Sequence, residues 1–119
     1  MNKLAVLAIV AFVVFAAGTA ALILRGFSTS RTVANVVIAN HEFGPSTATV
    51  RAGTTVRWTN MDHVAHSVMM GAHDDSAGGM DSGLLGHMAT FAYTFQEPGT
   101  YEYHCDPHPY MTGIVIVTP

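Results

Sequence analysis

The sequence predicts an all-β domain, a β-sandwich, preceded by one N-terminal transmembrane helix. From residue 33 onward, β-branched and aromatic residues occur in seven short runs that glycine, proline and asparagine separate. Turn signals at intervals of about 8 to 12 residues are typical of β-sandwiches. Before residue 25, the chain carries a long apolar run instead. We therefore expect an anchor or uncleaved signal over residues 1–24, a linker over 25–32 and one domain over 33–119.

The apolar run covers residues 4–24 and contains no charge, with Lys3 and Arg25 on its two sides. As a helix, these 21 residues would rise about 32 Å at about 1.5 Å each, enough to cross a hydrocarbon core of about 30 Å. The alternative is a cleaved signal peptide, whose apolar region is normally about 7 to 15 residues long. We predict a membrane anchor with the domain outside the cytoplasm, on a periplasmic or extracellular face; secretion after cleavage is the alternative.

The charge of the chain argues against a nucleic-acid partner, and the single cysteine argues against an internal disulfide. Beyond Lys3 the chain has four basic and eight acidic residues, a net charge of −4, and no basic tract. Nucleic acid is therefore not an expected partner. One cysteine cannot form an internal disulfide, so Cys105 is a candidate ligand.

Seven strands are expected in the domain. Alternation is clearest over residues 54–60, where Val56 and Trp58 share the inward face. Residues 41–45 are expected to form a turn. The predicted strands cover residues 33–39, 46–51, 54–60, 64–70, 89–95, a segment that ends at Cys105, and 113–117.

The chemistry is concentrated near the C-terminus. Cys105, His108 and Met111 lie at intervals of three residues and offer a thiolate, an imidazole and a thioether on one loop. A type 1 copper site for electron transfer combines two histidines, one cysteine and a long axial methionine. The loop therefore requires one more histidine upstream.

His66 is the predicted upstream ligand, and His63 is its rival. Alternation over residues 64–70 places Val64, His66 and Val68 on the inward face, whereas His63 faces the other way. A histidine between inward valines would, by itself, be a buried structural residue. The missing imidazole of the copper loop favours the ligand role.

The segment 71–88 has no periodic pattern and is expected to be a long loop. It contains several residues that could bind a second metal, but no spacing among them defines a site. A solvated connection between strands is therefore the favoured interpretation. The candidate ligands are His73, Asp74, Asp75, Met80, Asp81, His87 and Met88.

Residues 99–111 resemble the copper loop of amicyanin, within the plastocyanin/azurin group of cupredoxins, because the Cys-x-x-His-x-x-Met spacing is the short amicyanin variant. The pattern Val50-x-x-Gly53-x-x-Val56-x-Trp58-x-Asn60 also resembles the strands that precede the first copper histidine. The resemblance covers nearly the whole domain and favours His66 over His63, since His66 stands directly before Ser67-Val68. It implies a Greek-key β-sandwich that binds one copper ion through His66, Cys105, His108 and Met111.

The sequence departs from this family at two positions. Ser67 stands where asparagine is usual, and Asp106 where serine or threonine is usual. We hypothesise that the Ser67 hydroxyl donates to the Asp106 carboxylate and that Ser67, Asp106 and Asn60 support the ligands. The added negative charge would favour Cu(II) and lower the reduction potential. His104 faces away from the thiolate and is not an expected ligand.

The expected function is one-electron transfer through Cu(I)/Cu(II) to redox protein partners at the outer face of a membrane. The alternative is copper storage or delivery that also uses the Met- and His-rich residues 69–88. An enzyme is not expected, because Asp106 stands where multicopper oxidases have a second histidine beside the cysteine, and a dinuclear centre needs two cysteines.

Overall fold

The computed structural model describes residues 31–71 and 79–119. Arg31–Pro119 forms one compact unit. Within the described ranges, no helix is long and apolar enough to cross a membrane. The predicted anchor over residues 1–24 and most of the linker lie outside the described residues, as do His73, Asp74 and Asp75.

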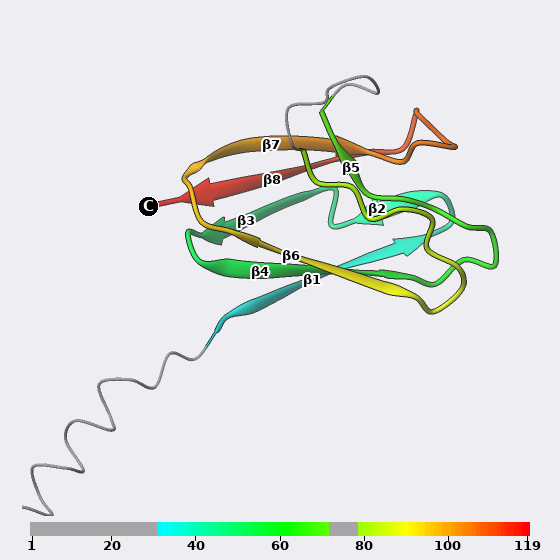
Figure 1. Cartoon of the computed structure of the whole chain (residues 1–119), viewed down its shortest axis with the longest axis horizontal. Coiled ribbons are helices and arrows are strands. Elements are labelled where there is room, and N and C mark those ends of the chain that lie inside the picture. Colours follow the sequence, from blue (N-terminus) through cyan, green and yellow to red (C-terminus); the bar gives the residue numbers. More distant parts are fainter. Residues whose placement is uncertain (1–30, 72–78) are drawn as a thin grey trace, which may run out of the picture. The chain divides into compact units, whose positions relative to one another are not determined.

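The domain is a sandwich of two four-stranded sheets (Figure 1). One sheet has the order β2-β1-β4-β6 and the other β3-β8-β7-β5. The pairs β1–β4 and β3–β8 are parallel, so the chain crosses repeatedly between the sheets. The strands are β1 (Val33–Ala39), β2 (Glu42–Gly44), β3 (Thr47–Arg51), β4 (Thr54–Asn60), β5 (Met69–Met70), β6 (Thr90–Phe95), β7 (Gly99–His104) and β8 (Thr112–Thr118).

The predicted β-sandwich is confirmed, and β1 and β4 have the expected bounds. Two expectations were wrong. Residues 41–45 contain the short strand β2, because Phe43 is buried and pairs with Ile38. Residues 64–68 are not a strand, and Val64 is 47% exposed although alternation placed it inward. Of the strand expected over residues 64–70, only β5 forms.

Aromatic rings fill the space between the sheets. Trp58 of β4 is fully buried and packs against Phe91 and Phe95 of β6 and, edge to face, against Tyr103 of β7. Gly113 of β8 lies directly against the Tyr103 ring, where a Cβ atom would overlap the ring and its hydroxyl. The core therefore fixes β7 against β8, and the metal-ligand loop connects these two strands.

The β1–β2, β4–β5 and β7–β8 connections lie at the same end of the sandwich, the right-hand side of Figure 1. Asp62 accepts hydrogen bonds from the backbone N–H groups of Asn40 (2.8 Å) and His41 (2.9 Å), which joins the first connection to the second. The candidate ligands come from the second and third connections. The topology thus brings residues more than 35 positions apart in sequence to one place.

Candidate metal centre

Cys105 enters the interior directly after β7. Tyr101, Tyr103 and Cys105 alternate inward along the strand as predicted, and Cys105 is 0% exposed. The Ser67 backbone N–H donates to Cys105 Sγ at 3.3 Å. This contact ties the cysteine side chain to the residue that follows His66.

His66 is held by backbone hydrogen bonds outside any strand. Its N–H donates to the Leu85 carbonyl at 3.1 Å, and the Leu85 N–H donates back at 2.7 Å. The side chain is 0% exposed. The inward position predicted for His66 is confirmed, but an isolated β-bridge provides it, not a continuous strand.

His108 and Met111 belong to a loop that closes on itself. The Cys105 N–H donates to the Met111 carbonyl at 3.1 Å, and the Met111 N–H donates to the His108 carbonyl at 2.9 Å. Met111 is 2% exposed, whereas His108 is half-buried. Pro107 and Pro109 fix φ on both sides of His108 and restrict the loop further.

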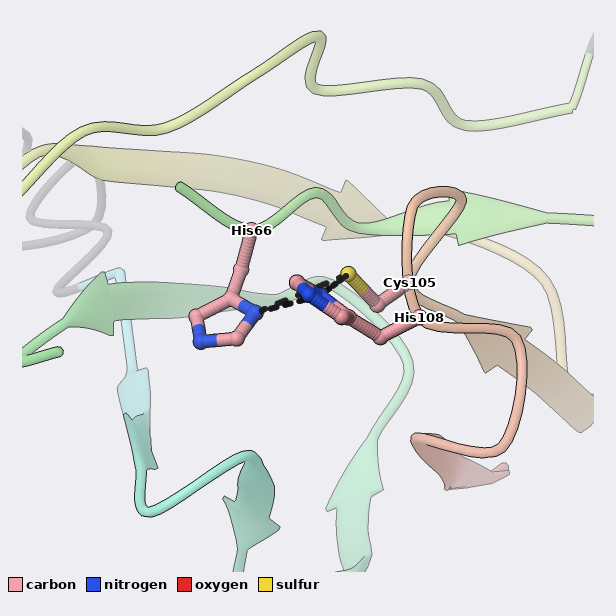
Figure 2. A group of neighbouring side chains, drawn as sticks. All are labelled: His66, Cys105 and His108. Atoms are coloured by element: carbon pink, nitrogen blue, oxygen red, sulfur yellow. Dashed lines mark hydrogen bonds between the residues drawn. The ribbon is translucent and has the colours of Figure 1, made fainter. Parts of the chain in front are cut away.

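Three donor atoms from these residues converge, as Figure 2 shows. His66 Nδ1 lies 3.7 Å from Cys105 Sγ, His108 Nδ1 lies 3.5 Å from the same sulfur, and the two nitrogens are 3.2 Å apart. With the bond lengths of zinc, a comparable first-row ion (about 2.0 Å to nitrogen and about 2.3 Å to sulfur), a trigonal site would have edges of about 3.5 to 3.7 Å. The observed triangle fits one metal ion at its centre.

The protonation state of His108 suits this role. Partial burial lowers the pKa of His108, and the neighbouring imidazoles of His66 and His41 lower it further. A lower pKa keeps the ring neutral, with a lone pair available for a metal. Two imidazoles, one thiolate and a nearby thioether form the donor set that suits copper.

Asp62 was missed by the sequence reasoning. Its Oδ2 lies 2.8 Å from His66 Nε2, so the carboxylate accepts a hydrogen bond from Nε2–H while Nδ1 faces the cysteine. The pKa of Asp62 is lowered to about 2, chiefly by the hydrogen bond from the His41 N–H and also by the contact with His66, while burial acts in the opposite direction. A carboxylate behind a ligating histidine orients the ring and raises its basicity.

His41 was also missed. Its ring lies edge-on to His66, with centroids 5.0 Å apart, and to His108, with centroids 5.1 Å apart. The donor atoms of His41, Asp62 and His66 lie within 4.8 Å of one another. No periodic pattern marks this residue, which follows β1 and has a positive φ of 58°.

Ser67 and Asp106 connect the two ligand segments, but through a different hydrogen bond from the one predicted. The backbone N–H of Asp106 donates to Ser67 Oγ at 2.8 Å, so this contact uses the backbone of Asp106 and not its carboxylate. The Ser67 backbone N–H also reaches the cysteine sulfur, as described above. Ser67 thus contacts both the ligand and the residue after it.

Asn60 organises the connections without touching a ligand. Its side chain is fully buried at the end of β4. Nδ2 donates to the carbonyls of Val64 and Leu85, both at 2.9 Å, and Oδ1 accepts from the Asp62 N–H at 2.9 Å. Asn60 therefore holds the segments that carry Asp62 and position His66.

The remaining candidates do not gather around these ligands. His63 stacks on His87, and His104 pairs with Met69 on β5. Met80 is a core residue at 3% exposure, and Asp81 accepts from the Gly83 N–H. Among the described residues of 71–88, none belongs to a group of three or more histidine, cysteine or acidic side chains whose donor atoms converge.

A β-sandwich in which a buried cysteine and two histidines converge in a trigonal arrangement is characteristic of type 1 copper domains. A family model described as copper binding proteins, plastocyanin/azurin family, matches residues 31–118. The chain belongs to this family. The cofactor is one copper ion, and His66, Cys105, His108 and Met111 are positioned as its ligands.

Relatives and solved structures agree with this assignment. The chain is 37% identical over 86 residues to amicyanin-alpha of Methylorubrum extorquens, with 69% of each chain covered. It is 37% identical over 68 residues to amicyanin of Paracoccus denitrificans, covering 57% of this chain and 52% of that protein. The solved Cu(I) form of an amicyanin mutant matches with a TM-score of 0.67 and 31% identity, over 76% of this chain and 87% of that one.

Proposed function

We propose that the protein is a one-electron carrier whose copper is bound by His66, Cys105, His108 and Met111. The observation that supports this proposal is the triangle of His66 Nδ1, Cys105 Sγ and His108 Nδ1, with edges of 3.2 to 3.7 Å. When bound there, copper supplies the Cu(I)/Cu(II) couple. The family and its matched relatives fit a carrier and not an enzyme.

The ligands are restrained by hydrogen bonds that do not depend on the metal. His66 is fixed by Leu85 and Asp62, and Cys105 by Ser67 and by the closed loop to Met111. A site restrained in this way rearranges little when the charge on the metal changes. Small rearrangement permits fast electron transfer.

Electrons are expected to enter and leave at His108. His66, Cys105 and Met111 are buried, whereas His108 is half-buried and Tyr110 beside it is 71% exposed. The ring centroids of His108 and Tyr110 are 6.1 Å apart. Redox protein partners would therefore dock on this end of the sandwich, and the acidic net charge favours a partner with basic residues in a salt-sensitive complex.

We also propose that residues 1–24 anchor the protein in a membrane, with the copper domain on the outer face. The support is the uncharged run over residues 4–24. Alkaline extraction of membranes tests the anchor, and proteolysis of intact cells tests the side. Release of a shortened chain into the medium or periplasm would favour signal cleavage and contradict the anchor.

Spectroscopy of residues 31–119 loaded with Cu(II) tests the copper assignment. We expect an intense thiolate-to-copper absorption band and a type 1 electron spin resonance spectrum. Cys105→Ser and His66→Gln should both lose the band, while His63→Gln, the matched control, should keep it. Circular dichroism verifies that each variant is folded. Absence of the band in the wild type, or its loss in His63→Gln alone, would overturn the ligand assignment.

A further inference from the structure

His63 and His87 form an exposed histidine pair beside the copper centre. Their rings stack, with centroids 4.1 Å apart and planes inclined by 20°. Both side chains are exposed. They come from different connections, since His63 precedes the ligand His66 and His87 follows Leu85, which is hydrogen-bonded to His66.

One hydrogen bond fixes the tautomer of His87. Its Nδ1 lies 3.1 Å from the Asp62 carbonyl, which can only accept, so Nδ1 carries the proton and Nε2 has a free lone pair. Among the described residues, no hydrogen bond joins a ring nitrogen of His63 to another group. A histidine with one nitrogen bonded to a backbone carbonyl and the other exposed has the usual arrangement of a metal ligand.

Two exposed methionines flank this pair in the sequence. Met61 is 44% exposed and Met88 is 56% exposed. The Met88 N–H donates to the Asn60 carbonyl at 2.6 Å, and the Asn60 N–H donates to the Ala89 carbonyl at 3.0 Å, so the segments that carry them run side by side. Thioethers add soft donors to the two imidazoles, a combination that suits copper.

We propose that His63 and His87 bind a second transition-metal ion, separate from the copper ion at Cys105. Two nitrogens on one ion at about 2.0 Å lie about 3 Å apart. The ring centroids are 4.1 Å apart in the stacked pair, so we expect metal binding to rotate the exposed His63 ring until one of its nitrogens reaches this separation from His87 Nε2. Among divalent first-row ions Cu(II) should bind most tightly, and Zn(II) should also bind.

The second site is connected to the first through Asp62. The Asp62 carbonyl accepts from His87 Nδ1, and the Asp62 carboxylate contacts His66 Nε2. A cation bound by His63 and His87 adds positive charge behind His66 and should favour Cu(I), which raises the reduction potential. This coupling depends on the proposed redox function, whereas the second site itself does not.

The test uses the full chain, purified in detergent and loaded with one equivalent of Cu(II). Calorimetric titration with Zn(II) should show one further ion per chain. His63→Gln and His87→Gln should each weaken Zn(II) binding at least 10-fold, and His104→Gln, a matched control, should bind as the wild type does. The proposal is overturned by non-saturable binding, or by wild-type affinity in His63→Gln and His87→Gln.

Voltammetry of the same samples tests the coupling. Zn(II) should raise the reduction potential of the copper ion in the wild type and leave the potentials of His63→Gln and His87→Gln unchanged. Saturable Zn(II) binding with an unchanged wild-type potential would overturn the coupling while supporting the site. A missing thiolate-to-copper band before Zn(II) is added would instead contradict the proposed redox function.

Discussion

Replacing Asp62 by asparagine tests the support behind His66. The carboxylate accepts hydrogen bonds from the Asn40 and His41 N–H groups and contacts His66 Nε2 at 2.8 Å. An amide of the same size keeps one acceptor oxygen and places an NH₂ group where the second oxygen accepted. At least one of the three N–H groups that donate to Asp62, those of Asn40, His41 and the His66 ring, then faces the NH₂ group, which is itself a donor.

The magnitude follows from the pKa of Asp62, which the fold lowers from 3.8 to about 2. One pKa unit corresponds to about 1.4 kcal/mol, so ionised Asp62 contributes about 2 kcal/mol to the free energy of unfolding at neutral pH. Because the pKa is depressed in the folded state, this contribution is complete above about pH 4. It is lost as the pH falls through about 2.

Urea denaturation of copper-free residues 31–119 measures this contribution. At pH 7, Asp62→Asn should unfold with a free energy about 2 kcal/mol below the wild type, and the difference should shrink as the pH approaches 2. Asp81→Asn is the charge-matched control, because among the described residues the exposed Asp81 carboxylate accepts a hydrogen bond only from the Gly83 N–H, at 2.9 Å. A difference of equal size at pH 7 and near pH 2, or no difference at pH 7, would refute the reasoning.

Three further substitutions give expected outcomes. Gly113→Ala should lower the free energy of unfolding by about 1 to 3 kcal/mol in thermal melts, because the new Cβ overlaps the Tyr103 ring; an unchanged melting temperature would contradict this. Asp106→Asn should raise the copper potential in voltammetry by removing negative charge while its backbone bond to Ser67 persists; an unchanged or lower potential would be inconsistent with that effect. Ser67→Ala should cost about 1 to 3 kcal/mol in urea denaturation, since the Asp106 N–H loses its acceptor, and wild-type stability would exclude an important role for this bond.

The sandwich and the C-terminal ligands were predictable because both depend on local patterns. β4 alternates between buried and more accessible residues along its whole length, so its bounds and its inward Trp58 follow from periodicity. Cys105, His108 and Met111 share one loop whose backbone hydrogen bonds are internal, so their spacing alone indicates a site. In these cases neighbours in sequence determine the geometry.

The β1–β2 connection was not predictable in the same way. β2 has three residues, too few for a period-2 pattern, and its pairing with β1 depends on Asn40 and His41, which have φ values of 52° and 58°. This conformation directs both backbone N–H groups to Asp62, 21 or more residues away. The residues next to Asp62 in the sequence therefore do not indicate that the backbone N–H groups of Asn40 and His41 donate to its carboxylate.

The error over residues 64–68 has a related cause and explains how His66 is positioned. A strand would have placed Val64 and His66 on one face, but the chain leaves the sheet at Asn60, whose amide binds the carbonyls of Val64 and Leu85. Leu85 in turn pairs with His66 through backbone hydrogen bonds. The buried side chain of Asn60 therefore holds this segment in place, where hydrogen bonds to a neighbouring strand would have held a continuous strand. Removal of the Asn60 amide would take one hydrogen bond from each of these carbonyls, although the Leu85 carbonyl would still accept from the His66 N–H, and would loosen the segment that carries the ligand. Asn60 therefore acts on the copper centre by positioning the backbone on both sides of His66, without contact with any ligand atom.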